Sequence, residues 1–222
     1  MMKKLVMVLS MVFLLSFLIL SPNQVDASEK TKVCDGVQAA MELKMEMRKL
    51  WSQHVLWTGR FAVSDLADLA DKADVLERLL RNQDDIGSAI GSYFGEEAGN
   101  ILAQLLREHI LIAGQVVEAA KNNDKAALES SKKLWYENAD QIAKFLADTN
   151  PNWEYKPMKK LLFMHLELLT EQFAARAKKD WAGDITAYDK GEAHIIKLAD
   201  ALSSGILRQF PEKFAMNCQC QE

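Results

Sequence analysis

The stretch Leu105-Leu106-Arg107-Glu108-His109 places a leucine four residues before a histidine, and the same pattern occurs twice more in the chain. It is found from Leu50 to His54 and from Leu161 to His165, so the three histidines are 55 and 56 residues apart. A fixed period of this length is typical of a repeated supersecondary unit. The spacing therefore predicts three copies of one structural unit.

An aspartate lies at a corresponding place in the second half of each predicted unit. Residues 82–86 (Asn-Gln-Asp-Asp-Ile) align with residues 138–142 (Asn-Ala-Asp-Gln-Ile) at a shift of 56, and residues 198–202 are a looser third copy, displaced by a further 60. The aspartates in these stretches are Asp84, Asp140 and Asp200. The unit is predicted to be a helix with a histidine, a turn, and a helix with an aspartate.

Apolar side chains recur at intervals of three and four residues along most of the chain, the pattern of amphipathic helices. No stretch shows the period-two alternation of a strand. The sequence predicts an all-α fold, a bundle of about six helices made of three tandem helical hairpins, as a single domain over residues 36–214. The helices are expected at residues 35–70, 75–94, 96–120, 127–149, 158–179 and 188–210.

Three glycines recur at every fourth residue in the second predicted helix and its end: Gly87, Gly91 and Gly95. A face of this kind lets a partner helix approach closely. The alternative is a hinge or a ligand groove. We expect close helix packing.

The N-terminal residues have the three parts of a secretory signal peptide: the basic pair Lys3-Lys4, an apolar or small-residue run from Leu5 to Leu20, and small residues before a cleavage point after Ala27. Residues 1–27 are thus predicted to be removed, and residues 28–35 to form a polar lead. The sixteen apolar residues are short for a spanning helix, so an uncleaved membrane anchor is the alternative. Either interpretation places the domain at the cell surface or in the medium.

The mature chain carries 25 basic and 30 acidic residues, a net charge of −5. It has no basic stripe, so no nucleic-acid partner is expected. A membrane partner is expected only if the N-terminal segment stays uncleaved. About half of the residues are apolar, which is sufficient for one well-buried domain.

The three cysteines lie at the two ends of the mature chain, Cys34 at one end and Cys218 and Cys220 in the tail of residues 215–222. In an exported chain two of them are expected to pair. Cys34 could bridge to either tail cysteine and so join the termini. The alternative is a Cys-x-Cys metal or redox site, for which two thiols alone are few ligands.

In two of the three units, at about 1.5 Å per residue, the histidine and the aspartate would stand at nearly one level on antiparallel helices. One interpretation is a buried histidine that donates a hydrogen bond to the aspartate. Another is a transition-metal site in which the carboxylates are ligands or orient the histidines; the third is a polar pocket for an organic ligand. The candidate metal ligands are His54, His109, His165, Asp84, Asp140 and Asp200.

Motifs of common enzyme classes are missing from the sequence. There is no Gly-x-Ser-x-Gly, no glycine-rich phosphate loop and no His-Glu-x-x-His, and no histidine has a glutamate three residues before it, as di-iron bundles require. The sequence therefore favours an exported binding or structural protein of the cell envelope or exterior. A metal-binding protein is the first alternative, and a hydrolase or transferase of unfamiliar type the second.

Three stretches resemble a family of small exported proteins from Gram-positive, spore-forming bacteria: residues 50–58 (LWSQHVLWT), 135–143 (WYENADQIA) and 205–211 (GILRQFP). The resemblance covers most of residues 48–214. Some members of that family are named acetylglutamate kinases or glycosyltransferases, activities that would require strands alternating with helices around a nucleotide site. The resemblance implies that His54, Asn138, Asp140 and the Gln-Phe-Pro end belong to family patterns, without a role for them.

Overall fold

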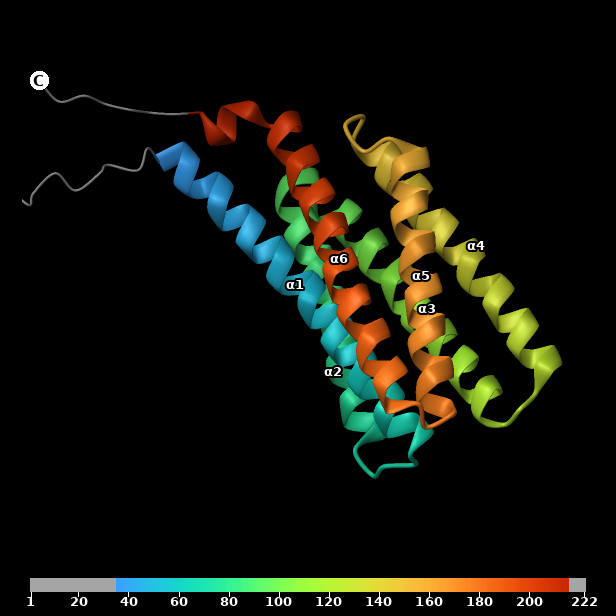
Figure 1. The fold of residues 1–222 in the computed structure, drawn as a ribbon. Coiled ribbons are helices and arrows are strands. Elements are labelled where there is room, and N and C mark those ends of the chain that lie inside the picture. The colour runs from blue at the N-terminus through green and yellow to red at the C-terminus, as the bar shows by residue number, and fades with distance from the viewer. Residues whose placement is uncertain (1–34, 216–222) are drawn as a thin grey trace, which may run out of the picture. The chain divides into compact units, whose positions relative to one another are not determined.

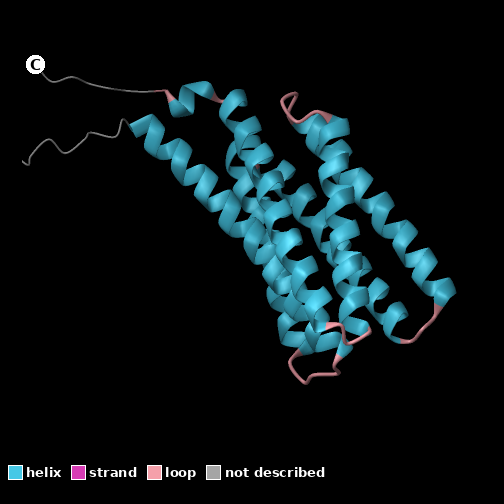
Figure 2. Ribbon diagram, viewed as in Figure 1, coloured by secondary structure: helices cyan, strands magenta, loops and turns pink. Residues whose placement is uncertain are grey.

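The computed structural model describes residues 35–215, which form six α-helices and a closing 3₁₀ turn, with no strand (Figures 1 and 2). The all-α prediction is thus confirmed. The elements are α1 (Asp35–Leu66), α2 (Lys72–Phe94), α3 (Glu96–Lys121), α4 (Lys125–Thr149), α5 (Tyr155–Ala177), α6 (Trp181–Gln209) and η1 (Pro211–Phe214).

Helix starts differ most from the sequence expectation, because polar first turns lack the apolar periodicity that the prediction used. The expected start of the sixth helix at residue 188 is wrong, because α6 begins at Trp181. Asp180 caps α6, and its side chain accepts a hydrogen bond from the Gly183 backbone N–H at 3.0 Å. The helix therefore already includes residues 181–187.

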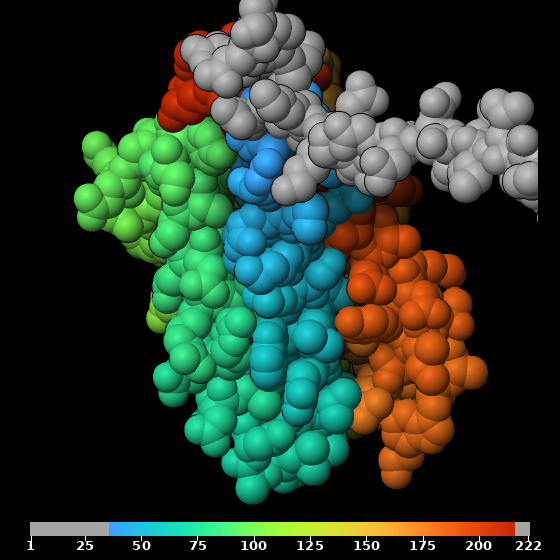
Figure 3. Space-filling model, turned by 90° about the vertical axis from the view of Figure 1, so that its left-hand side faces the viewer, coloured from blue at the N-terminus to red at the C-terminus, as the bar shows by residue number. Residues whose placement is uncertain are grey.

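The helices pack as sequential neighbours, and α6 returns to pack against α1, which closes the bundle. Figure 3 shows α1, in blue, between α2 and α6. The odd-numbered helices also contact one another, so α1, α3 and α5 form the inner part of the bundle. Because consecutive helices are antiparallel, these three inner helices run in the same direction (Figure 1).

Every helix contributes at least one large, fully buried side chain to the core. Examples are Met47 on α1, Ile86 on α2, Leu106 on α3, Trp135 on α4 and Leu166 on α5, joined by Leu202 on α6. Each such burial stabilises the fold by about 1.5–3 kcal/mol. The apolar stripes that the sequence showed at helical spacing are the faces that meet here.

The three inner helices end in the same way. Each is followed by a residue with a left-handed backbone, and the next N–H donates to a carbonyl five residues earlier, as in a Schellman motif. The left-handed residues are Asp68, Asn123 and Lys179, with φ of 51°, 54° and 60°. The bonds join Leu69 to Ser64, Asp124 to Ala119 and Asp180 to Ala175, at 2.9, 3.0 and 2.9 Å. The left-handed residues are 55 and 56 residues apart, as the histidines are.

Glycines bring α2 and α3 into close contact. A Cβ on Gly99 of α3 would lie 2.7 Å from the Gly87 carbonyl oxygen and 2.9 Å from the Gly91 Cα, both on α2. The expected close packing is therefore confirmed for Gly87 and Gly91. Gly95 does not share in it, because it has φ of 94° at the junction of the two helices and has open space around its Cα.

Some sequence predictions lie outside the described residues. These are the signal peptide or anchor of residues 1–27, nearly all of the polar lead, and the pairing of Cys34, Cys218 and Cys220. Within residues 35–215, none of the helices combines the length and the apolar character needed to cross a membrane.

Replacing Gly99 by alanine is expected to destabilise the protein by about 1–3 kcal/mol, because the new methyl group would overlap α2 backbone atoms. Gly191 is the control: a Cβ there meets no atom within 4 Å, so Gly191→Ala should stabilise α6 by up to about 1 kcal/mol. Urea unfolding of the two variants measures both changes. Equal effects would contradict the close helix approach.

Lys179→Gly is expected to stabilise the protein by about 1 kcal/mol, since only glycine adopts the left-handed region without strain. Lys178, its neighbour, has φ of −83°, so Lys178→Gly should instead cost about 0.5–1 kcal/mol. Thermal melts compare the pair. A Lys179→Gly variant no more stable than Lys178→Gly would refute the assigned backbone conformation.

Candidate functional site: a buried histidine cluster

Three of the histidines meet inside the bundle. His54 on α1, His109 on α3 and His165 on α5 are 1%, 3% and 2% exposed. The Nε2 atoms of His54 and His165 are 3.3 Å apart. The ring of His165 lies 5.3 Å from that of His54 and 6.4 Å from that of His109, between centroids. The structure thus brings together the three histidines that the sequence singled out.

Amide side chains on the outer helices hold two of these rings. Gln83 Oε1 lies 3.2 Å from His54 Nδ1, and Asn138 Oδ1 lies 2.7 Å from His109 Nδ1. The amide NH₂ groups donate to backbone carbonyls, at Leu79 and Leu105 respectively, so it is the oxygens that face the rings. Both Nδ1 atoms therefore carry the proton, and both Nε2 atoms carry a lone pair.

The sequence placed a histidine beside an aspartate in two of the three units, but the structure does not bring these groups together. The three aspartates point to the surface of the bundle, where each binds a cation. Asp84 pairs with Arg107 at 2.9 Å, Asp140 with Lys159 at 2.6 Å, and Asp200 with Arg48 at 2.7 Å. None of them lies with the histidines as a ligand or as an orienting group.

Helix geometry explains this error. Each residue advances a helix by about 100°. Asp84 lies one position after Gln83 and Asp140 two positions after Asn138, so both aspartates lie on another face than the amides. A neutral amide also enters a core at a lower desolvation cost than a carboxylate. In the third unit the predicted level is also wrong, because Asp200 lies six residues beyond His194, which already contacts α5 one turn before His165.

A shared spacing could have identified the true partners. Gln83 and Asn138 each lie 29 residues after the histidine that they contact. The third residue at this spacing is His194, which sequence reasoning left unused. Its Nε2 contacts the Leu161 carbonyl oxygen at 2.8 Å, so it does not bind His165.

The leucines of the opening pattern take part in a contact that recurs three times. Their backbone carbonyls accept hydrogen bonds from polar side chains of the following helix. Asn82 donates to Leu50 at 3.1 Å, Asn138 to Leu105 at 3.1 Å, and His194 to Leu161 at 2.8 Å. The leucine four residues before each histidine thus marks a fixed contact within each helix pair.

Burial keeps the cluster neutral. Desolvation lowers the pKa of His54 to about 3, with a further contribution from His109, and it lowers the pKa of His109 to about 4. The pKa of His165 is also held well below its usual value, first by desolvation and then by the nearby histidines. At neutral pH the centre of the bundle therefore holds uncharged imidazoles.

Several buried polar atoms at the cluster lack a hydrogen-bond partner among the described residues. They are Nδ1 of His165 and the indole Nε1 atoms of Trp51 and Trp135. The Trp51 ring packs against His54, and the Trp135 ring against His109, each at 5.4 Å between centroids. Buried polar groups are normally paired with protein, water or ion, so this centre offers unused hydrogen-bonding capacity.

The arrangement supplies nitrogen donors suited to a transition metal. With Zn–N bonds of about 2.0–2.1 Å, a 3.3 Å separation of two Nε2 atoms corresponds to an angle of about 105–110° at the metal, close to tetrahedral. Within residues 35–215, however, no three His, Cys, Asp or Glu side chains enclose a common metal position. His109 would have to move toward the other two rings to complete a three-histidine set.

No family model, curated protein or solved structure matches this chain. The resemblance to exported proteins of spore-forming bacteria therefore stays a prediction. The function has to be inferred from the geometry of the bundle and from the sequence.

Stability is expected to fall below about pH 6.5, because the unfolded chain then takes up protons on histidines that the fold keeps neutral. The lowered pKa values of about 3 for His54 and about 4 for His109 place the loss between pH 6.5 and those values. Each buried histidine contributes a slope of up to about 1.4 kcal/mol per pH unit. Urea unfolding at about pH 7.5 and about pH 5 measures the slope.

The variant His109→Gln isolates one of these contributions, since an amide does not titrate. Its stability should depend less steeply on pH than that of the unaltered protein, by about one proton. An unchanged slope, or a protein equally stable at both pH values, would show that the histidines are not buried in neutral form.

Proposed function

We propose that this chain is an exported helical-repeat protein that binds a transition-metal ion between the histidines of its three inner helices. The 3.3 Å separation of the His54 and His165 Nε2 atoms, with the His109 ring beside them, carries the proposal. Neutral imidazole is the form that binds metals, and burial maintains it here. No proton has to leave these rings before a metal binds.

The amides supply a second line of support. Metal-binding histidines usually donate their other ring N–H to a fixed acceptor, which sets the tautomer and the ring orientation. Gln83 and Asn138 are such acceptors for His54 and His109. Nδ1 of His165 has no partner in the described part of the chain, so this ring is the least constrained of the three.

We further infer that the bundle consists of three tandem hairpins: α1 with α2, α3 with α4, and α5 with α6. The left-handed residues after the inner helices and the leucine carbonyl contacts recur at the period of the histidines. Such an arrangement brings one histidine from each unit to a common axis.

The proposal includes export. The basic pair Lys3-Lys4, the apolar run from Leu5 to Leu20 and the small residues before Ala27 support a cleaved leader. An exported chain folds outside the cytoplasm, where it can take up a metal as it folds. This order suits the site, because a cluster that is at most 3% exposed has no open path for an ion in the folded state.

A structural role is the second candidate function, and the separation of the His54 and His165 Nε2 atoms supports it as well. A separation of 3.3 Å also suits a hydrogen bond in which the His165 Nε2–H donates to the His54 lone pair. The cluster would then be a neutral polar core that fixes which helices meet. In that case the function at the cell envelope would depend on the surface of the protein and not on the histidine cluster.

Metal uptake during refolding separates the two candidates. The protein without residues 1–27 and without a histidine tag would be unfolded in urea and refolded with Zn²⁺, Co²⁺, Ni²⁺ or Cu²⁺. We expect one ion per chain after desalting, a Co²⁺ spectrum of tetrahedral nitrogen coordination, and a higher melting temperature that a chelator abolishes during refolding.

His194 is the matched control, since it is the one remaining histidine and lies outside the cluster. His194→Gln should retain the ion, whereas His54→Gln and His165→Gln should each lose it. Absence of bound metal after refolding, or equal loss in His194→Gln, would overturn the metal proposal and leave the polar-core role.

A further inference from the structure

A cavity of about 750 Å³ opens at the end of the bundle where the three inner helices stop. It is bordered by the last turns of α1, α3 and α5 and by the first turns of α4 and α6, at the lower end of the bundle in Figure 1. Its size falls within the range of small-molecule sites. The cavity is separate from the histidine cluster, which lies about 9 to 13 residues before the floor residues on the inner helices, roughly 14–20 Å away along the helix axis.

The floor of the cavity is apolar because the ends of the inner helices carry small side chains. The alanines are Ala67, directly after α1, Ala119 and Ala120 of α3, and Ala174 and Ala177 of α5, and Leu66 at the end of α1 adds a larger apolar side chain. Alanines at these positions leave the bundle open, where leucines would have closed it. Leu128 of α4 adds a further apolar wall.

The rim carries five cations against one carboxylate. The cations are Lys121, Lys125, Arg176, Lys178 and Lys179, and the carboxylate is Asp68. Trp181, which is 51% exposed, stands on the same rim, and the Arg176 guanidinium lies over its ring at 5.1 Å. The cavity thus combines an apolar floor with a positive entrance.

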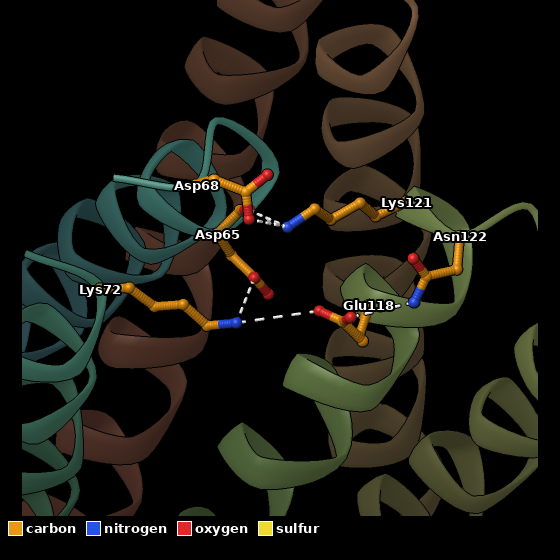
Figure 4. Close-up of polar contacts among 6 residues, drawn as sticks. All are labelled: Asp65, Asp68, Lys72, Glu118, Lys121 and Asn122. Atoms are coloured by element: carbon orange, nitrogen blue, oxygen red, sulfur yellow. Dashed lines mark hydrogen bonds and ion pairs between the residues drawn. The ribbon is translucent and has the colours of Figure 1, made fainter. Parts of the chain in front are cut away.

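Two of the five cations form ion pairs with carboxylates. Figure 4 shows Lys121 directed at Asp68, and its Nζ also donates to the Asp65 backbone carbonyl at 3.0 Å. Arg176 binds Asp184 at 2.9 Å. In the described residues, Lys125, Lys178 and Lys179 have no such partner, so three ammonium groups remain available to a ligand.

Cations near helix C-termini also complement the helix dipole. That effect accounts for Lys121, Arg176 and Lys178, which stand at or next to the ends of α3 and α5. It does not explain Lys125, which begins α4, or the exposed tryptophan, or an open cavity of this volume over alanines. A ligand with an anionic head and an apolar chain accounts for all of these features.

We propose that this cavity binds a single-chain anionic amphiphile of the fatty-acid type. The alkyl chain would lie on the alanine floor between the helix ends, and the carboxylate would meet Lys125, Lys178 and Lys179. The inference goes beyond metal binding and uses none of the histidines.

The test uses the mature protein at neutral pH with monomeric dodecanoate as the probe. Calorimetric titration should give one dodecanoate per chain, and the fluorescence of Trp181 should change in parallel. Dodecyltrimethylammonium, which has the same chain and the opposite charge, should bind at least tenfold more weakly. Equal affinity for the two amphiphiles would overturn the proposal.

Three variants locate the site. Lys178→Glu/Lys179→Glu should weaken dodecanoate binding at least tenfold, whereas Lys156→Glu/Lys160→Glu, with the same change of net charge at the other end of α5, should not. Ala120→Phe, which fills the floor without a change of charge, should abolish binding. In Trp181→Phe the calorimetric signal should persist while the fluorescence change disappears. Loss of affinity in the control pair equal to that in the rim pair would refute the assignment.

Vesicles distinguish a free amphiphile from a membrane lipid. The same protein would be sedimented with phosphatidylcholine vesicles with or without anionic phosphatidylglycerol. Binding of dodecanoate without vesicle binding supports the proposal. Binding to anionic vesicles without binding of monomeric dodecanoate would overturn it in favour of a membrane surface.

Discussion

The structure depends on one constraint: three imidazoles lie in an apolar interior, and their polar atoms need partners. Gln83 and Asn138 meet this need for His54 and His109, and each amide is itself held by a backbone carbonyl of its own helix pair. An unpaired buried polar group costs about 1–3 kcal/mol. The bonds therefore set the rotation of each outer helix against its inner neighbour, and apolar packing alone would leave that rotation less defined.

The third helix pair departs from this scheme, and the departure creates the site. The residue that corresponds to Gln83 and Asn138 is His194, which binds the Leu161 carbonyl and leaves Nδ1 of His165 without a partner in the described chain. His165 instead faces His54 through Nε2. A perfectly regular repeat would hold all three rings by amides. The broken symmetry leaves the His165 ring without an amide partner in the described chain.

The middle of the inner helices differs from their loop end in the size of the side chains. Toward the middle of the bundle, large side chains such as Met47, Leu106 and Leu166 close the core around the histidines. At the loop end, alanines leave a cavity that lysines surround. One set of three parallel helices thus carries a buried cluster of imidazoles in its middle and an open cavity at its end.

The sequence by itself determined the helices and their number, because apolar periodicity is a local property of the chain, and the equal spacing of the three histidines singled them out as one set. It also contained the 29-residue spacing to Gln83, Asn138 and His194, although a search for carboxylates led to Asp84, Asp140 and Asp200. Only the tertiary structure decided which helix face turns inward, since a displacement of one residue rotates a side chain by about 100°. It likewise decided that the ends of the inner helices form a cavity, because that depends on which distant alanines meet when the bundle closes.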